Sequence, residues 1–256
     1  MKAGKQKSNN IYELEGVYGD SDKFTSKNIR LKHMLNYVKN IRYKPKRILD
    51  IGCGTGFFAD KMKTIFPQAE IFGIDISRKA LSIAKEKYSN IEFRNADAEV
   101  KLPFKSNFFD LIISGEHIEH TKDVDRYLEE ISRVMNKNGT LILTTPNLGS
   151  WLNRILLIFG LQPFYLEPSL KKTLPILTYL GKTFPEDLDS PPSGHLRLYT
   201  LNMLKKLLKF YGFTMLDVKG TFILKGKILK QIDMFFSNIP PLSYGLVLKL
   251  KKNKEF

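Results

Sequence analysis

Residues 48–56 read Ile-Leu-Asp-Ile-Gly-Cys-Gly-Thr-Gly, a short apolar run that carries an acid and ends in three glycines at alternate positions. A continuous apolar run of this length is typical of a parallel strand that is buried on both faces. Glycines directly after such a strand allow a tight turn whose backbone approaches a ligand. The stretch therefore predicts a strand, a ligand-binding loop and a following helix.

Strand-like and helix-like patterns alternate five times between residues 48 and 145. The expected strands are 48–52, 70–75, 91–94, 109–114 and 140–145. The expected helices are 57–66, 78–88 and 123–135, with Ser77 as the N-cap residue of the second. This alternation predicts an α/β fold with a doubly wound parallel sheet, right-handed crossovers and helices on both faces.

The segments before and after this core follow other patterns. Residues 1–45 are expected to form a helical lead-in, because helical spacing of apolar residues is clear there. Residues 46–256 are expected to form the main domain, with irregular inserts at 149–195 and 221–241 that cover it as a lid. The last regular elements expected are a helix at 201–211, capped by Thr200, and strands at 213–220 and 244–251.

The acid and the glycines of the opening stretch form the pattern Asp-x-Gly-x-Gly-x-Gly. These residues are Asp50, Gly52, Gly54 and Gly56. The pattern resembles motif I of the class I S-adenosylmethionine (SAM) dependent methyltransferases, especially the type 11 family. The resemblance covers residues 46–147 well and 196–251 more loosely. It implies SAM as the cofactor and a Rossmann-like, seven-stranded sheet that is mostly parallel, with an antiparallel last strand between the fifth and the sixth.

Residues suited to bind SAM follow the first three expected strands, whose carboxyl ends meet at one edge of the sheet. The resemblance implies that the glycines approach the methionine part of SAM and that Asp50 lies beside it. It implies that Asp75, about twenty residues further on, accepts the ribose hydroxyls and that Ile76 lies against the adenine. Asp97 and Ala98 resemble the pair at the adenine edge. On residue type alone, Asp75 could instead cap a helix and Asp97 could shape a turn.

Residues 114–120 read Ser-Gly-Glu-His-Ile-Glu-His, so two acids and two histidines crowd the end of the fourth strand. Ser114 is assigned to the cofactor site. The catalytic candidates are Glu116, His117, Glu119 and His120. Methyl transfer requires alignment of the acceptor with the methyl carbon and the sulfur. An oxygen acceptor also requires a group that takes its proton, which a carboxylate or a neutral histidine can do.

Glu116-x-x-Glu119-His120 resembles the E-x-x-E-H element of ubiquinone-biosynthesis O-methyltransferases. The resemblance implies a divalent cation held by these three residues, which would share one face if the stretch is helical. Without a metal, the same residues would close the cofactor pocket or cap the next helix. His117 points in another direction and is either an independent base or exposed.

Residues 194–200 read Gly-His-Leu-Arg-Leu-Tyr-Thr and resemble an H-x-R-x-[FY]-T element of small-molecule and glycan methyltransferases. His195, Arg197 and Tyr199 alternate, so an extended segment would turn all three toward an acceptor. The arginine could hold a carboxylate or a phosphate. The alternative is a surface loop in which Thr200 caps the next helix.

Basic residues exceed acidic residues by 41 to 26, which leaves a formal charge of +15. This charge suggests an anionic partner such as a membrane surface, or simply a lysine-rich solvated surface. The apolar stretch 151–166 is too short to span a bilayer, and is expected to be a lid or a contact with a membrane interface. The single cysteine and the polar N-terminus suit a cytoplasmic protein, with peripheral contact at the inner face of the membrane as the alternative.

The acceptor is expected to be a hydroxyl of a small, lipid-linked or glycan molecule. An Asn/Asp-Pro-Pro-aromatic pattern, which the amino-group methylases of nucleobases and amides carry after the fourth strand, is missing at that place. A nucleic-acid methyltransferase is therefore a lower-ranked alternative. An NAD(P)-dependent oxidoreductase is disfavoured by the glycine spacing, which differs from G-x-G-x-x-G. A non-catalytic module of the same fold would bind SAM without turnover. The oligomeric state does not follow from the chain.

Overall fold

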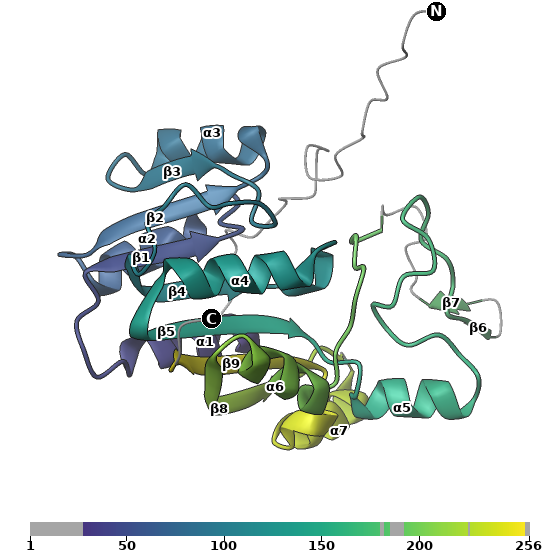
Figure 1. The fold of residues 1–256 in the computed structure, drawn as a ribbon. Coiled ribbons are helices and arrows are strands. Elements are labelled where there is room, and N and C mark those ends of the chain that lie inside the picture. Colours follow the sequence, from purple (N-terminus) through teal and green to yellow (C-terminus); the bar gives the residue numbers. More distant parts are fainter. Residues whose placement is uncertain (1–27, 180–181, 185–191, 225, 254–256) are drawn as a thin grey trace, which may run out of the picture.

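Seven strands form one mixed sheet in the order β3-β2-β1-β4-β5-β9-β8 (Figure 1). The computed structural model describes residues 28–179, 182–184, 192–224 and 226–253. The strands are β1 (Arg47–Ile51), β2 (Glu70–Asp75), β3 (Glu92–Asn95), β4 (Phe109–Gly115), β5 (Met135–Pro146), β8 (Phe213–Thr221) and β9 (Gly245–Lys252). Neighbours among the first five strands pair in parallel, whereas β9 is antiparallel to both β5 and β8. The predicted seven-stranded sheet with an antiparallel last strand is confirmed.

Helices cover both faces of this sheet, as predicted. On one face lie α1 (Ile29–Lys39), α2 (Phe57–Ile65) and α3 (Arg78–Lys87), whose buried residues share one apolar cluster (Figure 1). On the other face lie α4 (Val124–Val134) and α6 (Leu201–Phe210), whose buried residues share a second cluster. The central strands are mostly apolar because both of their faces pack against helices.

The expected helix boundaries have local causes that the structure makes visible. The Ser77 hydroxyl accepts a hydrogen bond from the backbone N–H of Ala80 and caps α3. The Thr200 hydroxyl accepts from the N–H of Met203 and caps α6 in the same way. Both side chains satisfy an N–H group that has no partner inside its helix.

The two inserts are more regular than the sequence suggested. The first contains α5 (Trp151–Ile158) and an antiparallel ribbon of β6 (Leu177–Tyr179) and β7 (Lys182–Phe184). The second contains α7 (Lys227–Ser237) and a 3₁₀ turn, η3 (Pro240–Leu242). The expectation of an irregular second insert is therefore wrong, and the reason is that α7 begins after Gly226 without a side chain that caps it, so no local start signal marks the helix. Of the expected helical lead-in, residues 1–27 lie outside the described part of the chain.

A buried lysine fastens the last strand to the rest of the sheet. Lys252 of β9 donates hydrogen bonds to the carbonyls of Ser132 (2.6 Å) and Met135 (2.8 Å) and to Oδ1 of Asn107 (3.2 Å). Ser132 lies in the last turn of α4, where carbonyl groups lack partners inside the helix. The Lys252 ammonium group therefore links β9 to the last turn of α4 and to the first residue of β5.

Lys252→Met is expected to lower the free energy of unfolding by about 2–3 kcal/mol, since it keeps the apolar stem and leaves buried carbonyls without a donor. Urea denaturation of the purified protein measures the difference. Lys251→Met is the matched control, because Lys251 lies on the same strand and is half-exposed. Equal stability of the two variants would show that the buried bonds contribute nothing.

Candidate cofactor and acceptor site

Three positions of the loop after β1 have backbone conformations that favour glycine. Gly52, Gly54 and Gly56 all have positive φ angles, of 69°, 52° and 84°. A Cβ atom on Gly52 would lie 2.7 Å from Nδ1 of His117, and one on Gly56 would lie 2.7 Å from the ring of Phe93. The three glycines thus permit both the left-handed turns and the close approach of two ring side chains.

Asp75, at the end of β2, shapes the same loop. Its Oδ2 accepts a hydrogen bond from the N–H of Gly54 (2.9 Å), and its Oδ1 accepts from the N–H of Ser77 (2.8 Å). The side chain is buried. A carboxylate offers about four lone-pair directions, which is why an acid at this place is the expected acceptor for ribose hydroxyls. Asp75 therefore combines the role at the helix start with a geometry that suits the cofactor.

Asp50 lies buried in β1, just before the glycines, and its Oδ2 finds no hydrogen-bond partner among the described residues. Burial and, secondarily, the nearby Asp75 raise the pKa of Asp50 to about 8, although a backbone bond from Ala59 opposes the rise. A buried polar atom without a partner is costly, and such atoms mark sites where a ligand completes the bonding. SAM carries an ammonium group and a sulfonium, so the residues present fit this cofactor.

The other expected cofactor residues differ in what they offer. Ile76 presents an exposed apolar side chain, which suits an adenine ring. Oδ1 of Asp97 accepts from the N–H of Glu99 (2.8 Å), so the turn role is present, and Ala98 is buried. The Ser114 hydroxyl is fully buried and bonded to the Tyr127 hydroxyl (2.5 Å). The Ser114 side chain therefore faces α4, and only its backbone could meet a cofactor.

The expected grouping of Glu116 with Glu119 and His120 is not present. Glu116 has a positive φ of 51°, and the only turn of helix, η2 (Ile118–His120), is a 3₁₀ turn that begins two residues later. The Glu116 carboxylate accepts from the Thr144 hydroxyl (2.8 Å) and lies 3.3 Å from the Arg30 guanidinium. The premise of one shared helical face is therefore wrong.

His195 takes the place of Glu116 beside the other two. One ligand-type atom each of Glu119, His120 and His195 lies within 4.8 Å of the others. The rings of His120 and His195 are 4.8 Å apart, and Nδ1 of His120 lies 3.1 Å from the carbonyl of Gly194. We call Glu119, His120 and His195 the acceptor cluster.

Burial controls the protonation of the acceptor cluster. Glu119 is fully buried, and neither carboxylate oxygen makes a hydrogen bond of ordinary geometry within the described chain. Its pKa rises to about 7, because burial outweighs the Thr145 hydroxyl and the charge of Arg30. Burial and the neighbouring His120 lower the pKa of His195 to about 4. The cluster therefore holds an acid whose pKa burial raises beside an imidazole that is neutral at neutral pH.

His117 connects the acceptor cluster to the glycine loop. Its ring packs against Gly52 and stacks on Tyr127, with ring centroids 5.3 Å apart. Burial, followed by the charge of His120, lowers the pKa of His117 to about 4. Of the two alternatives for His117, an exposed side chain is wrong, because the ring is packed between the cofactor loop and α4.

Of the three residues expected on the acceptor side, His195 alone joins the acceptor cluster. The N–H groups of Leu196 and Arg197 both donate to the carbonyl of Glu119, at 2.8 and 3.1 Å, and tie the segment down. The Arg197 guanidinium donates to the carbonyl of Lys122 (2.6 Å), so this hydrogen bond holds it within the protein instead of directing it to an acceptor. The buried Tyr199 hydroxyl has no bond of ordinary geometry in the described chain, and burial raises its pKa, although the nearby Arg197 opposes the rise.

The sequence analysis did not identify several residues of the site. Arg30 of α1 faces Glu116 and Glu119. The Tyr165 ring packs edge-on against His195 (5.0 Å) and Tyr244 (5.4 Å). Their only signals are a charged residue in the lead-in helix and an aromatic residue in an insert, which carry no chemistry until the chain is folded.

Glu167 of the first insert supports the segment that carries His195. Its carboxylate accepts hydrogen bonds from the N–H groups of Ser193 (2.6 Å), Gly194 (2.8 Å) and His195 (3.0 Å). The insert therefore positions a member of the acceptor cluster.

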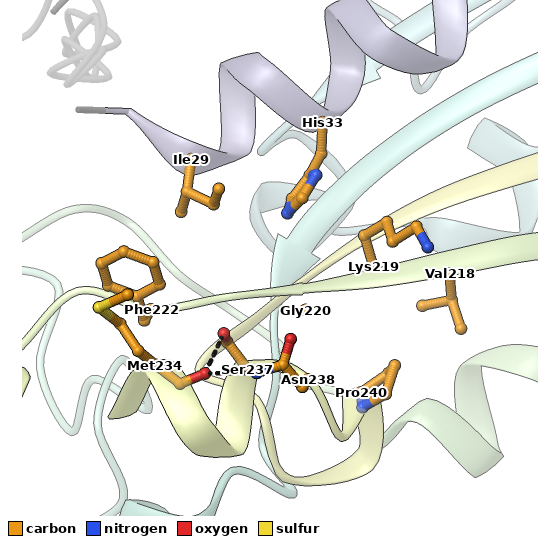
Figure 2. Close-up of a pocket in the computed structure, with 10 residues that line it drawn as sticks. All are labelled: Ile29, His33, Val218, Lys219, Gly220, Phe222, Met234, Ser237, Asn238 and Pro240. Atoms are coloured by element: carbon orange, nitrogen blue, oxygen red, sulfur yellow. Dashed lines mark hydrogen bonds between the residues drawn. The ribbon is translucent and has the colours of Figure 1, made fainter. Parts of the chain in front are cut away.

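A cavity of about 320 Å³ lies beside this site, between α1, β8 and α7. Figure 2 shows Ile29 and His33 of α1 on one side and Met234, Ser237 and Asn238 on the other. Its remaining lining residues are Val218, Lys219, Gly220, Phe222 and Pro240. None of the ten belongs to the expected cofactor site. Arg30 follows Ile29 and faces the acceptor cluster, so the first turn of α1 lies between the cavity and that cluster.

Comparison with known proteins defines the family. A family model described as a methyltransferase domain matches residues 43–173. A malonyl-[acyl-carrier protein] O-methyltransferase of Legionella pneumophila is 37% identical over 119 residues, which are 45% of this chain and 40% of that protein. A ubiquinone biosynthesis O-methyltransferase of Pelagibacter ubique is 31% identical over 125 residues, 47% of this chain and 48% of that protein. The chain thus spans less than half the length of these curated relatives.

The fold comparison agrees. The solved structure of the PH0226 protein of Pyrococcus horikoshii superposes with a TM-score of 0.60, covering 95% of this chain and 98% of the other, at 19% sequence identity. The chain belongs to the class I SAM-dependent methyltransferase family.

Asp75→Ala is expected to abolish detectable binding of S-adenosylhomocysteine, because the carboxylate holds the Gly54 N–H and is the expected ribose acceptor. Titration calorimetry measures the affinity, and circular dichroism shows whether the variant folds. Glu70→Ala, at the exposed start of the same strand, should bind normally. Unchanged affinity of the folded Asp75 variant would overturn the cofactor assignment.

Glu119→Gln tests the buried carboxyl through stability. Burial raises the pKa of Glu119 from 4.5 to about 7, so the folded state keeps a proton that the unfolded chain releases. The stability of the parent protein should therefore fall as pH rises through that window. The variant lacks this loss, and its stability relative to the parent should increase by up to about 3 kcal/mol between pH ~5 and ~8.

Urea denaturation of the ligand-free proteins at both pH values measures this change. Glu70→Gln should show no comparable gain, since its side chain is exposed. A pH-independent difference between the parent and the Glu119 variant would mean that Glu119 has an ordinary pKa.

Proposed function

We propose that this protein transfers the methyl group of SAM to a hydroxyl of a small, lipid-linked or glycan acceptor that binds beside the acceptor cluster. The observation that carries the proposal is the buried Glu119 carboxylate, which makes no hydrogen bond of ordinary geometry in the described chain and lies at the same sheet edge as the glycine loop. Both relatives described above are named O-methyltransferases, which supports an oxygen acceptor.

The cofactor would bind over the carboxyl ends of β1 and β2. SAM supplies a methyl group on a sulfonium, which is open to direct attack by the acceptor. The glycine loop offers backbone at close range, Asp75 offers lone pairs to the ribose, and Ile76 offers an apolar surface. The unpartnered oxygen of Asp50 suits the methionine ammonium. These groups mainly hold one reactant in line with the other, which is the main requirement of methyl transfer.

The acceptor hydroxyl must lose its proton as its oxygen bonds to the methyl carbon and the carbon–sulfur bond breaks. Glu119 suits the role of base, because a pKa of about 7 matches neutral pH. His195 is neutral there, and its Nδ1 has no partner among the described residues, so it suits a hydrogen bond to the acceptor. Glu116 and His117 position this machinery through Thr144 and Gly52.

The acceptor cluster also offers one carboxylate and two imidazoles, a ligand set that suits a divalent cation. When bound, such a cation would supply positive charge beside the acceptor oxygen. The cation set of this proposal differs from the one expected from sequence, since His195 replaces Glu116. If a chelator abolishes activity and added metal restores it, this result would favour activation of the acceptor by the cation over proton removal by Glu119.

The acceptor and the location of the protein form part of the same proposal. A lipid-linked acceptor suits a protein that is cytoplasmic and touches the inner face of an anionic membrane. The high positive charge and the apolar inserts support this contact. Nucleic acid is not proposed, because no described feature beyond charge favours it.

Purified protein, methyl-labelled SAM and a fractionated extract of the source cells test the proposal together. We expect label in the organic-extractable fraction, and none with the Asp75→Ala variant. Label only in the aqueous small-molecule or glycan pool would contradict a lipid-linked acceptor. Label in no fraction would contradict the methyltransferase activity.

With the labelled product in hand, Glu119→Gln should lower kcat by about 10²–10⁴-fold. The kcat of the parent should rise with pH through about 7, because the base must be ionised to accept a proton. The variant should lose this rise. A parent profile that is flat across neutral pH would exclude Glu119 as the base.

A further inference from the structure

Helix α7 has an unusual distribution of side chains for a helix of a globular domain, because it buries an acid and exposes large apolar groups. Its one buried residue is an acid, Asp233, in a helix that the structure describes throughout. Ile228, Leu229 and Phe235 expose 71%, 53% and 64% of their surface. An amphipathic helix normally turns such residues to the core. Exposed large apolar groups on neighbouring turns mark a surface that something else covers.

Helix α5 exposes apolar residues in the same way. Leu157, Ile158 and the following Phe159 expose 55%, 79% and 74% of their surface. Figure 1 shows α5 and α7 next to each other at one end of the sheet. We name the exposed apolar side chains of the two helices and their ends the α5–α7 surface. Its members are Ile155, Leu157, Ile158, Phe159, Ile228, Leu229, Ile232 and Phe235.

Polar and aromatic contacts hold the two helices together in place of apolar burial. The Trp151 ring of α5 stacks on Phe236 of α7 at 5.3 Å, and its Nε1 donates to Oδ1 of Asp233 (3.0 Å). Oδ2 of Asp233 accepts from the N–H groups of Ile223 (2.8 Å) and Leu224 (2.9 Å). Both oxygens of this buried acid are thus occupied. Apart from Leu156, which is buried, and the stacked Trp151 and Phe236 rings, most large apolar side chains of the two helices stay available for a partner.

The charge of the α5–α7 surface indicates the partner. The sequence of the two helices contains one acid, the buried Asp233, whereas Arg154, Lys227 and Lys230 are exposed. Apolar side chains mixed with cations and no exposed acid are typical of helices that lie in the interface of an anionic bilayer. Within the described part of the chain, every helix is too short or too polar to cross a bilayer.

We propose that the α5–α7 surface docks the protein on an anionic lipid membrane, with α5 and α7 lying in the plane of the headgroups. Both helices follow the carboxyl ends of strands, α5 after β5 and α7 after β8, so docking brings the acceptor edge to the membrane. Met234 of α7 also lines the cavity of Figure 2, with Ile29 and Phe222. The cavity also has polar lining residues such as His33 and Lys219, so its apolar side would receive the apolar part of a lipid-linked acceptor, a detail that rests on the proposed function.

Vesicle co-sedimentation tests the docking without SAM or acceptor. The full chain should bind phosphatidylcholine vesicles that contain phosphatidylglycerol, and bind weakly to vesicles of phosphatidylcholine alone. High salt should weaken the binding, because surface charges are screened. The double variant Ile228→Ser/Phe235→Ser should partition at least about tenfold less, since two large apolar groups no longer enter the interface.

Matched controls lie on α6. Met203 and Phe210 expose 55% and 68% of their surface, so Met203→Ser/Phe210→Ser removes comparable apolar groups elsewhere. Lys227→Glu/Lys230→Glu should remove the preference for phosphatidylglycerol, whereas Lys205→Glu/Lys206→Glu on α6 should largely keep it. All variants should bind S-adenosylhomocysteine as the parent does, which shows that they fold.

Several outcomes would overturn the docking. If the α6 and α7 variants lose vesicle binding equally, the protein binds membranes non-specifically and α7 is not part of a docking face. If the protein binds no vesicle, the membrane proposal is wrong and the α5–α7 surface is a contact for a protein. Sedimentation velocity would then identify a second copy of this chain as that protein, if the parent forms dimers and only the α7 variant does not. Methyl transfer to an extracted acceptor could still proceed in either case, so failure of the docking and failure of the proposed function are distinguishable.

Discussion

The contact between Gly52 and His117 is the constraint on which the rest of the site depends. Because Gly52 lacks a Cβ, the imidazole can press against the cofactor loop, and its other side stacks on Tyr127 of α4. This wedge fixes the chain at the end of β4, where Glu116 turns left-handed and η2 begins. The turn directs Glu119 inward. One backbone constraint thus links the loop that suits SAM to the cluster that suits the acceptor.

Buried polar groups of this protein fall into two kinds. Lys252 and Asp233 have bonded neighbours for their charged atoms, and they join elements that are distant in sequence. Asp50 and Glu119 keep oxygens without a bonded partner among the described residues, and burial raises the pKa of both. The first kind stabilises the fold. The second kind is unfavourable for folding alone, which is the pattern expected where a ligand completes the bonding.

The inserts add a layer of organisation to the common fold. The first insert positions His195 through Glu167 and carries α5. The second insert carries α7, whose Asp233 holds Trp151 of the first. The two inserts therefore act as one structure at the carboxyl edge, although about seventy residues separate α5 from α7 along the chain. Family membership explains the sheet and the glycine loop, whereas the inserts carry the features that would select an acceptor and a surface.

The sequence by itself determined the sheet, the helix starts at Ser77 and Thr200, and the glycine loop, because each depends on hydrophobic period, capping or backbone freedom within a few residues. Only the tertiary structure decided which groups meet. His120 reaches Gly194 across 74 positions, Arg30 comes from the lead-in helix, and Glu116 leaves the cluster through a left-handed turn. Helix α7 escaped notice because it begins after Gly226 without a capping side chain, and the outward direction of its apolar face is a property of the folded chain.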